Sequence, residues 1–71
     1  MERRRPAHVV NQLPAVLRRL GVSWGELSRR TLLPLPLLAR LRVPNANPRL
    51  AIAERVAGAL GVPVERLWRA G

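Results

Sequence analysis

Arginine supplies nearly all of the chemically active side chains in this 71-residue chain. All 13 basic residues are arginines, and only four glutamates oppose them, which leaves a formal net charge of +9. Such a domain attracts polyanions, because neutralising phosphates releases their condensed counterions. Codon usage or thermal adaptation offers another explanation for the arginine content, but surface arginine networks do not usually leave so large an imbalance. The composition therefore favours a nucleic-acid partner.

The side chains that most catalytic sites require are missing from the sequence. It contains no Cys, Asp or Tyr, and His8 is its single histidine. Nucleophilic and metal-assisted catalysis both lack their usual residues, and there is no glycine-rich phosphate loop. We therefore expect no enzyme activity, no metal site and no cofactor.

Membrane insertion is equally unexpected. No apolar run approaches the roughly 20 residues of a membrane span, and the charged N-terminus is not followed by an apolar region. We expect a soluble, cytoplasmic, nucleoid-associated protein with no membrane partner.

Short helices must position the central arginines. Ser23 is a good helix N-cap, and Glu26 follows at the spacing of a capping box. A second helix is expected to begin near Pro34, because proline is tolerated in the first helical turn. Residues 23–43 therefore predict two short helices joined by a tight corner. Their inner faces are expected to carry Leu27, Leu38 and Leu41.

Apolar periodicity predicts three further helices around this pair. The first begins near Asn11 as a cap, tolerates Pro14 in its opening turn and ends at Gly21. Another spans roughly residues 49–60, and the last begins after Pro63. The expected core positions are Leu13, Val16, Leu17 and Leu20 on the first helix, Ile52, Ala53, Val56 and Leu60 on the fourth, and Val64, Leu67 and Trp68 on the last.

This arrangement resembles the lambda-repressor-like, Cro-type family of helix-turn-helix DNA-binding proteins over roughly residues 11–68. The residues that carry the resemblance are Leu13, Val16, Gly21, Val22, Ser23, Glu26, Leu27, Ser28, Asn47, Pro48, Leu50, Val56, Ala57, Leu60, Gly61, Val62, Leu67 and Trp68. The resemblance implies an all-α fold, a compact bundle of five short helices with a central helix-turn-helix. We expect this domain to span residues 10–70, behind a basic flexible arm at residues 1–9.

The resemblance also implies a small transcriptional regulator of the repressor or antitoxin type, whose second helix of the pair lies in the DNA major groove. The expected base-facing residues are Leu35, Pro36, Ala39, Arg40, Arg42 and Val43. The expected DNA-backbone residues are Ser23, Trp24, Arg29, Arg30, Asn45 and Asn47. The two asparagines would equally well satisfy their own turn or cap the next helix. Arg3, Arg4 and Arg5 in the arm would enter a minor groove or add only nonspecific affinity.

The sequence departs from the family pattern on the surface that would contact DNA. Leu32 stands where the family usually has Gly, and a left-handed conformation there costs on the order of 1 kcal/mol, so we expect a different turn. Pro34, Leu35 and Pro36 offer bases no hydrogen bond. Only Arg40 and Arg42 on this helix can pair with guanine bidentately, which predicts strong binding with weak base discrimination.

The same departures support a second hypothesis from another class. The apolar stretch 34–37 is unusual for a solvated helix start, and an exposed apolar patch usually indicates an interface. The scaffold would then serve as a protein-interaction or dimerisation module, with a protein partner at Leu35 and Leu37. A homodimer that also binds double-stranded DNA would combine both functions.

Overall fold

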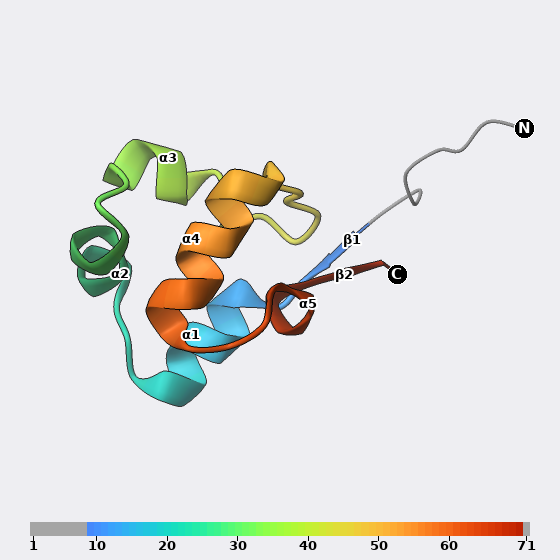
Figure 1. Ribbon diagram of the computed structural model, residues 1–71, viewed down its shortest axis with the longest axis horizontal. Coiled ribbons are helices and arrows are strands. Elements are labelled where there is room, and N and C mark those ends of the chain that lie inside the picture. The colour runs from blue at the N-terminus through green and yellow to red at the C-terminus, as the bar shows by residue number, and fades with distance from the viewer. Residues whose placement is uncertain (1–8, 71) are drawn as a thin grey trace, which may run out of the picture.

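The computed structural model describes residues 9–70, which form five helices and one small sheet (Figure 1). The helices are α1 (Leu13–Leu20), α2 (Trp24–Thr31), α3 (Leu35–Ala39), α4 (Leu50–Leu60) and α5 (Val64–Leu67), and the strands are β1 (Val9–Asn11) and β2 (Trp68–Ala70). The predicted helical character is confirmed, but the all-α prediction is wrong because of the sheet. The predictions for Arg3, Arg4, Arg5 and His8 lie outside the described residues.

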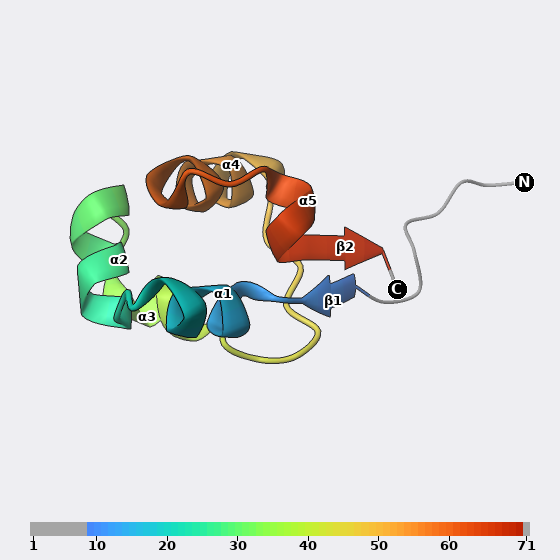
Figure 2. The same ribbon diagram turned by 90° about the horizontal axis from the view of Figure 1, so that it is seen from below.

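The helices enclose a core built almost entirely from aliphatic side chains. Seen from the side, α4 lies above α1 and α3, while α2 closes one end of the fold and the sheet projects from the other (Figure 2). The largest fully buried side chains are Leu13, Leu27, Leu38, Val56 and Leu67. Each of the five helices contributes one of these residues, so the core joins every helix of the bundle. None of the helices within residues 9–70 is long and apolar enough to cross a membrane.

The junction between α2 and α3 follows the predicted corner closely. The Ser23 hydroxyl accepts a 3.0 Å hydrogen bond from the backbone N–H of Glu26, which confirms the predicted cap. Pro34 is the N-cap residue of α3. Leu38 and Leu41 are buried as expected, although Leu41 lies beyond the end of the helix.

Leu32 adopts the left-handed conformation with φ 62°, so the expectation of a different turn is wrong. Two side chains of α2 hold the backbone of the next residue in place. The Ser28 hydroxyl donates to the carbonyl oxygen of Leu33 at 2.6 Å, and the Thr31 hydroxyl accepts from the N–H of Leu33 at 3.2 Å. Because Leu33 is also buried, packing and these bonds together offset the strain at Leu32.

The sheet replaces the predicted C-terminal end of the last helix. Strands β1 and β2 are antiparallel, with Val9 opposite Ala70 and Asn11 opposite Trp68. Trp68 was expected on the helix, but α5 ends at Leu67 and the backbone of Trp68 is extended. Its side chain nevertheless covers the core, with 8% of its surface exposed. The strand also begins at Val9, the last residue of the expected arm.

Two expectations for the first helix are also wrong. Its N-cap is Gln12, because Asn11 belongs to β1, although the Asn11 side chain still accepts a hydrogen bond from the N–H of Leu13. Leu20 was expected in the core but is 48% exposed. It is the last residue of α1, directly before the left-handed Gly21, and its side chain borders an open hollow.

Candidate nucleic-acid interface

Helix α3 is only five residues long, so part of the predicted contact surface lies in the turns that follow it. The predicted helix extended toward Val43, but Arg40 is the C-cap residue. Backbone bonds of the i to i+3 type continue the turn, from the N–H of Leu41 to the carbonyl of Leu38 and from the N–H of Arg42 to that of Ala39. Arg40 and Arg42 are therefore presented by a tight turn.

Asn11, thirty residues before Leu41 in the sequence, anchors this turn. Its Nδ2 amide donates to the carbonyl oxygens of Leu41 at 2.7 Å and Val43 at 2.8 Å. Its backbone N–H donates to the carbonyl of Pro44 at 3.2 Å. Three bonds from one residue thus fix the backbone on both sides of Arg42.

The first of two hollows beside α3, termed the α2–α3 hollow, has a volume of about 300 Å³. It is lined by Trp24, Leu35, Pro36, Leu38, Ala39 and Arg42. The guanidinium carbon of Arg42 lies 5.0 Å from the centroid of the Trp24 ring, within the range of a cation–π contact. This hollow unites four predicted base-facing residues with one predicted backbone residue, and Arg42 is its only charged side chain.

The second hollow, termed the α3–α4 hollow, lies between α3 and the start of α4 and has a volume of about 500 Å³. It is lined by Leu37, Arg40, Leu41, Ala46, Asn47, Pro48, Arg49 and Ile52. Arg40 and Asn47 were predicted contact residues, whereas Arg49 was missed. A signal was available, because Arg49 lies only two residues after Asn47, one of the loop asparagines that the resemblance places near DNA phosphates. The structure thus separates Arg40 from Arg42, which lines the other hollow.

Glu26 holds the two arginines at the end of α2. Its carboxylate lies 2.7 Å from Nη2 of Arg29 and 3.1 Å from Nε of Arg30. The hydrogen bonds from Arg29 and then Arg30 hold the pKa of Glu26 below its ordinary value. Both arginines remain exposed, so a phosphate can reach them, although Glu26 competes for one nitrogen of each.

Some predicted contact residues join neither hollow. Val43 is 47% exposed and Asn45 is exposed, but their side chains line neither the α2–α3 nor the α3–α4 hollow. The Ser23 hydroxyl is already engaged as the α2 cap. The structure therefore places Ser23, Val43 and Asn45 at neither hollow, and their contact with DNA remains a prediction.

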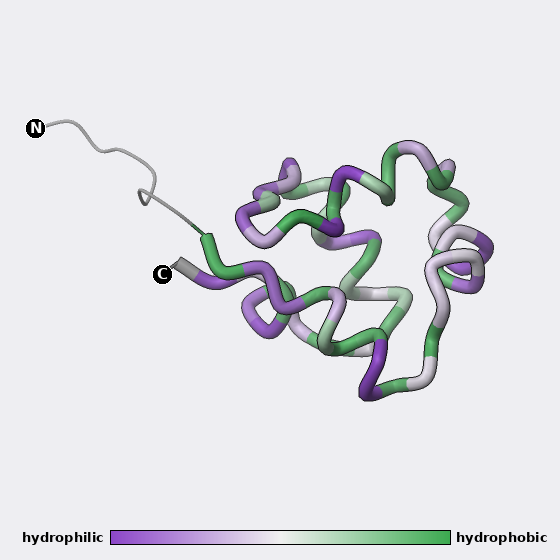
Figure 3. The backbone as a smooth tube through the Cα atoms, turned by 180° about the vertical axis from the view of Figure 1, so that it is seen from behind, coloured by the Kyte–Doolittle hydropathy of each residue, from purple (hydrophilic) through white to green (hydrophobic). Residues whose placement is uncertain are grey.

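Charge is distributed unevenly along the chain. Glu26 is the only carboxylate side chain between Glu2 and Glu54, whereas residues 27–53 contain five arginines. Four of the five residues of α3 are hydrophobic, as the colouring by hydropathy in Figure 3 reflects, and Leu35 among them is 51% exposed. The candidate surface is therefore apolar at its centre and basic around it.

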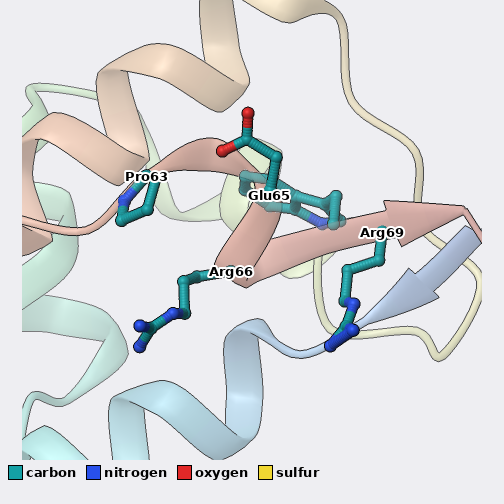
Figure 4. Close-up of a pocket in the computed structure, with 5 residues that line it drawn as sticks. Pro63, Glu65, Arg66 and Arg69 are labelled. Atoms are coloured by element: carbon teal, nitrogen blue, oxygen red, sulfur yellow. The ribbon is translucent and has the colours of Figure 1, made fainter.

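A second basic cluster lies on a different side of the fold and was missed by the sequence analysis. Arg19, Arg66 and Arg69 line a hollow of about 280 Å³ beside Leu20 and Val62. Arg66 and Arg69 extend toward α1, while Glu65 points the opposite way (Figure 4). These arginines come from α1, α5 and β2, so only the tertiary fold brings them together.

Comparisons with protein-family models and with curated protein sequences find no match to this chain.

Proposed function

We propose that this protein is a small regulator that binds double-stranded DNA through a lambda-repressor-like helix-turn-helix formed by α2 and α3. Helix α3 and the turn after it enter the major groove, and the flanking arginines contact phosphates. The charge of +9 supplies the long-range attraction to DNA.

One observation carries this proposal. Helix α2 packs against α3 so that Leu38 is buried while Leu35, Pro36 and Ala39 are left exposed on the outer face. The outer face of a surface helix normally carries charged or polar residues. This outer face carries no carboxylate. Arg40 and Arg42 follow immediately, in the turn fixed by Asn11. An uncharged helix face bordered by cations fits a groove bordered by phosphates.

The two hollows suggest different roles for the two arginines. Arg42, stacked on Trp24 in the α2–α3 hollow, faces the bases in this proposal and pairs with guanine. Arg40 shares the α3–α4 hollow with Asn47 and Arg49, a set of donors suited to phosphate oxygens. This division moves Arg40 from the predicted base-facing set to the backbone-facing set.

Titration of fluorescent 20-base-pair duplexes at two salt concentrations tests the proposal. Binding of the full chain is expected to weaken steeply with salt, with a slope of about 0.9 in log Kd per log salt for each phosphate contacted. Random and genomic sequence pools then measure base discrimination. Micromolar or weaker binding at low salt that does not change with added salt would reject the proposal.

A protein-binding or dimerising role is the second candidate, and the exposure of the α2–α3 turn favours it. Leu32 is 83% exposed and Leu35 is 51% exposed, and the two flank the corner of the helix pair. Leu37, the other residue expected to contact a protein partner, is half-buried beside the α3–α4 hollow. Neighbouring exposed leucines are typical of a contact surface.

The Leu35→Arg variant separates the two candidates. If the surface binds protein, the substitution abolishes self-association in analytical ultracentrifugation and leaves DNA affinity intact. If the surface binds DNA, the variant changes DNA binding and leaves the sedimentation coefficient unchanged.

A further inference from the structure

The α2–α3 hollow has a composition suited to one feature of the major groove. Its walls are the indole of Trp24 and the apolar side chains of α3, chiefly Leu35 and Ala39. In the major groove, the C5-methyl group of thymine is the one apolar feature that bases present. The volume of about 300 Å³ exceeds that of a single methyl group, so the hollow has room for one.

Arg42 adds a second chemical specificity at the edge of the same hollow. Its guanidinium group lies 5.0 Å from the Trp24 ring centroid, and no carboxylate within residues 9–70 pairs with it. Stacking on an aromatic face restricts an arginine side chain while leaving its N–H edge able to form bidentate hydrogen bonds. Guanine O6 and N7 are the base acceptors that fit this edge in the major groove.

We propose that the α2–α3 hollow recognises a thymine next to a guanine on one DNA strand, with the thymine methyl in the hollow and Arg42 on the guanine. The proposal rests on the proposed DNA-binding function and adds its base preference. Because Arg40 lines the other hollow, recognition at this step depends on Trp24, Leu35, Ala39 and Arg42.

Replacement of thymine by deoxyuridine tests the methyl contact, because it removes the methyl group and keeps every base-pairing and groove hydrogen-bonding group. The probes are a 24-base-pair duplex of repeating TG paired with CA, and the same duplex with every dT replaced by dU. The full chain is expected to bind the thymine duplex about fourfold more tightly per methyl group buried, which corresponds to about 0.8 kcal/mol per buried CH₂-sized group. The salt dependence of the two probes is expected to be equal.

Two variants locate the contact. Leu35→Gln keeps the length of the side chain but removes its apolar character, and it is expected to bring the thymine-to-uracil affinity ratio close to one. Leu50→Gln is the control, because Leu50 is 65% exposed at the start of α4 and does not line the α2–α3 hollow. Its ratio is expected to match that of the wild type.

The outcomes distinguish this proposal from the function on which it rests. Equal, salt-dependent affinity for both probes overturns the methyl contact and leaves DNA binding intact. A preference for thymine that survives in Leu35→Gln also overturns it, because the methyl is then bound elsewhere. Salt-independent or absent binding to both probes rejects the DNA-binding function together with it.

Discussion

The Nδ2 amide of Asn11 donates a 2.7 Å hydrogen bond to the carbonyl oxygen of Leu41, thirty residues further along the chain. The same amide donates to the carbonyl of Val43, so the strand before α1 holds the turn that carries Arg42. The position of Arg42, a candidate DNA-contacting residue, therefore depends on Asn11, which precedes both α2 and α3 in the sequence.

Asn11→Ala is expected to lower both stability and DNA affinity. The substitution removes the bonds to the carbonyl oxygens of Leu41 and Val43 and leaves the part-buried Leu41 oxygen without this donor, which costs on the order of 1–3 kcal/mol in the free energy of unfolding. Urea denaturation measures this loss, and duplex titration in the absence of urea measures the affinity. Gln12→Ala is the control, since the Gln12 side chain makes no capping bond at α1 and its change should stay within about 0.5 kcal/mol. Equal stability of the two variants would show that the Asn11 bonds contribute little.

Leu32→Gly is expected to stabilise the protein. Leu32 holds a left-handed conformation at 83% exposure, so glycine relieves strain of about 1–2 kcal/mol, part of which the greater freedom of the unfolded chain offsets. A net gain of about 0.5–1 kcal/mol in urea denaturation is the expected result. Leu32→Ala keeps the strain and is expected to remain near the wild type. A Leu32→Gly variant that is less stable than the wild type would contradict the presence of backbone strain at this turn.

Glu26→Gln is expected to strengthen DNA binding, because it releases Arg29 and Arg30 from their carboxylate partner. Each additional phosphate contact steepens the slope of log Kd against log salt by about 0.9. Glu65→Gln makes the same change in net charge on α5, which lies at the opposite end of the fold from α2 (Figure 1). Identical gains in the two variants would mean that net charge alone, rather than release of the two arginines, controls affinity.

Acid should remove the contribution of Glu26 to folding. Its pKa is lowered in the folded state by hydrogen bonds from Arg29 and Arg30, so this contribution is fully present above the unfolded pKa. It is lost as pH falls through the lowered folded value. The difference in urea stability between wild type and Glu26→Gln is therefore expected to shrink as pH falls below the usual glutamate range. A difference that grows toward acid pH has the wrong sign for this ion pair.

Arg49→Gln is expected to weaken DNA binding and to reduce the salt slope by about 0.9, the value for one phosphate. Arg49 borders the α3–α4 hollow with Arg40 and Asn47. Arg55→Gln carries the same charge change from an exposed position of α4 outside that hollow. If both variants lose the same affinity, the α3–α4 hollow has no particular role in phosphate contact.

Local sequence signals predicted α2, α3 and the ends of α1 and α4 well. The Ser23 cap depends on residues within one turn of the chain, and the left-handed Gly21 and Gly61 end α1 and α4 as glycine commonly does. Burial of Leu27 and Leu38 followed from helical periodicity. In each case the signal and the structure that it predicts lie close together in sequence.

Several of the missed features depend on distant parts of the chain. Val9 pairs with Ala70 and Asn11 bonds to Leu41, and nothing in either local sequence specifies the partner. The same reason explains why Trp68 was assigned to a helix, because its extended backbone is paired with β1. Arg19, Arg66 and Arg69 likewise line one hollow although they come from α1, α5 and β2.

Mapping of the contact surface tests the central claim most directly. Titration of the ¹⁵N-labelled full chain with a 20-base-pair duplex, followed by amide chemical shifts, identifies which face meets DNA. The largest changes are expected at Trp24, at residues 35–42 and at residues 47–49, with little change at Arg66 and Arg69. Changes concentrated around Arg19, Arg66 and Arg69, with α3 unaffected, would contradict the assignment of α3 to the major groove.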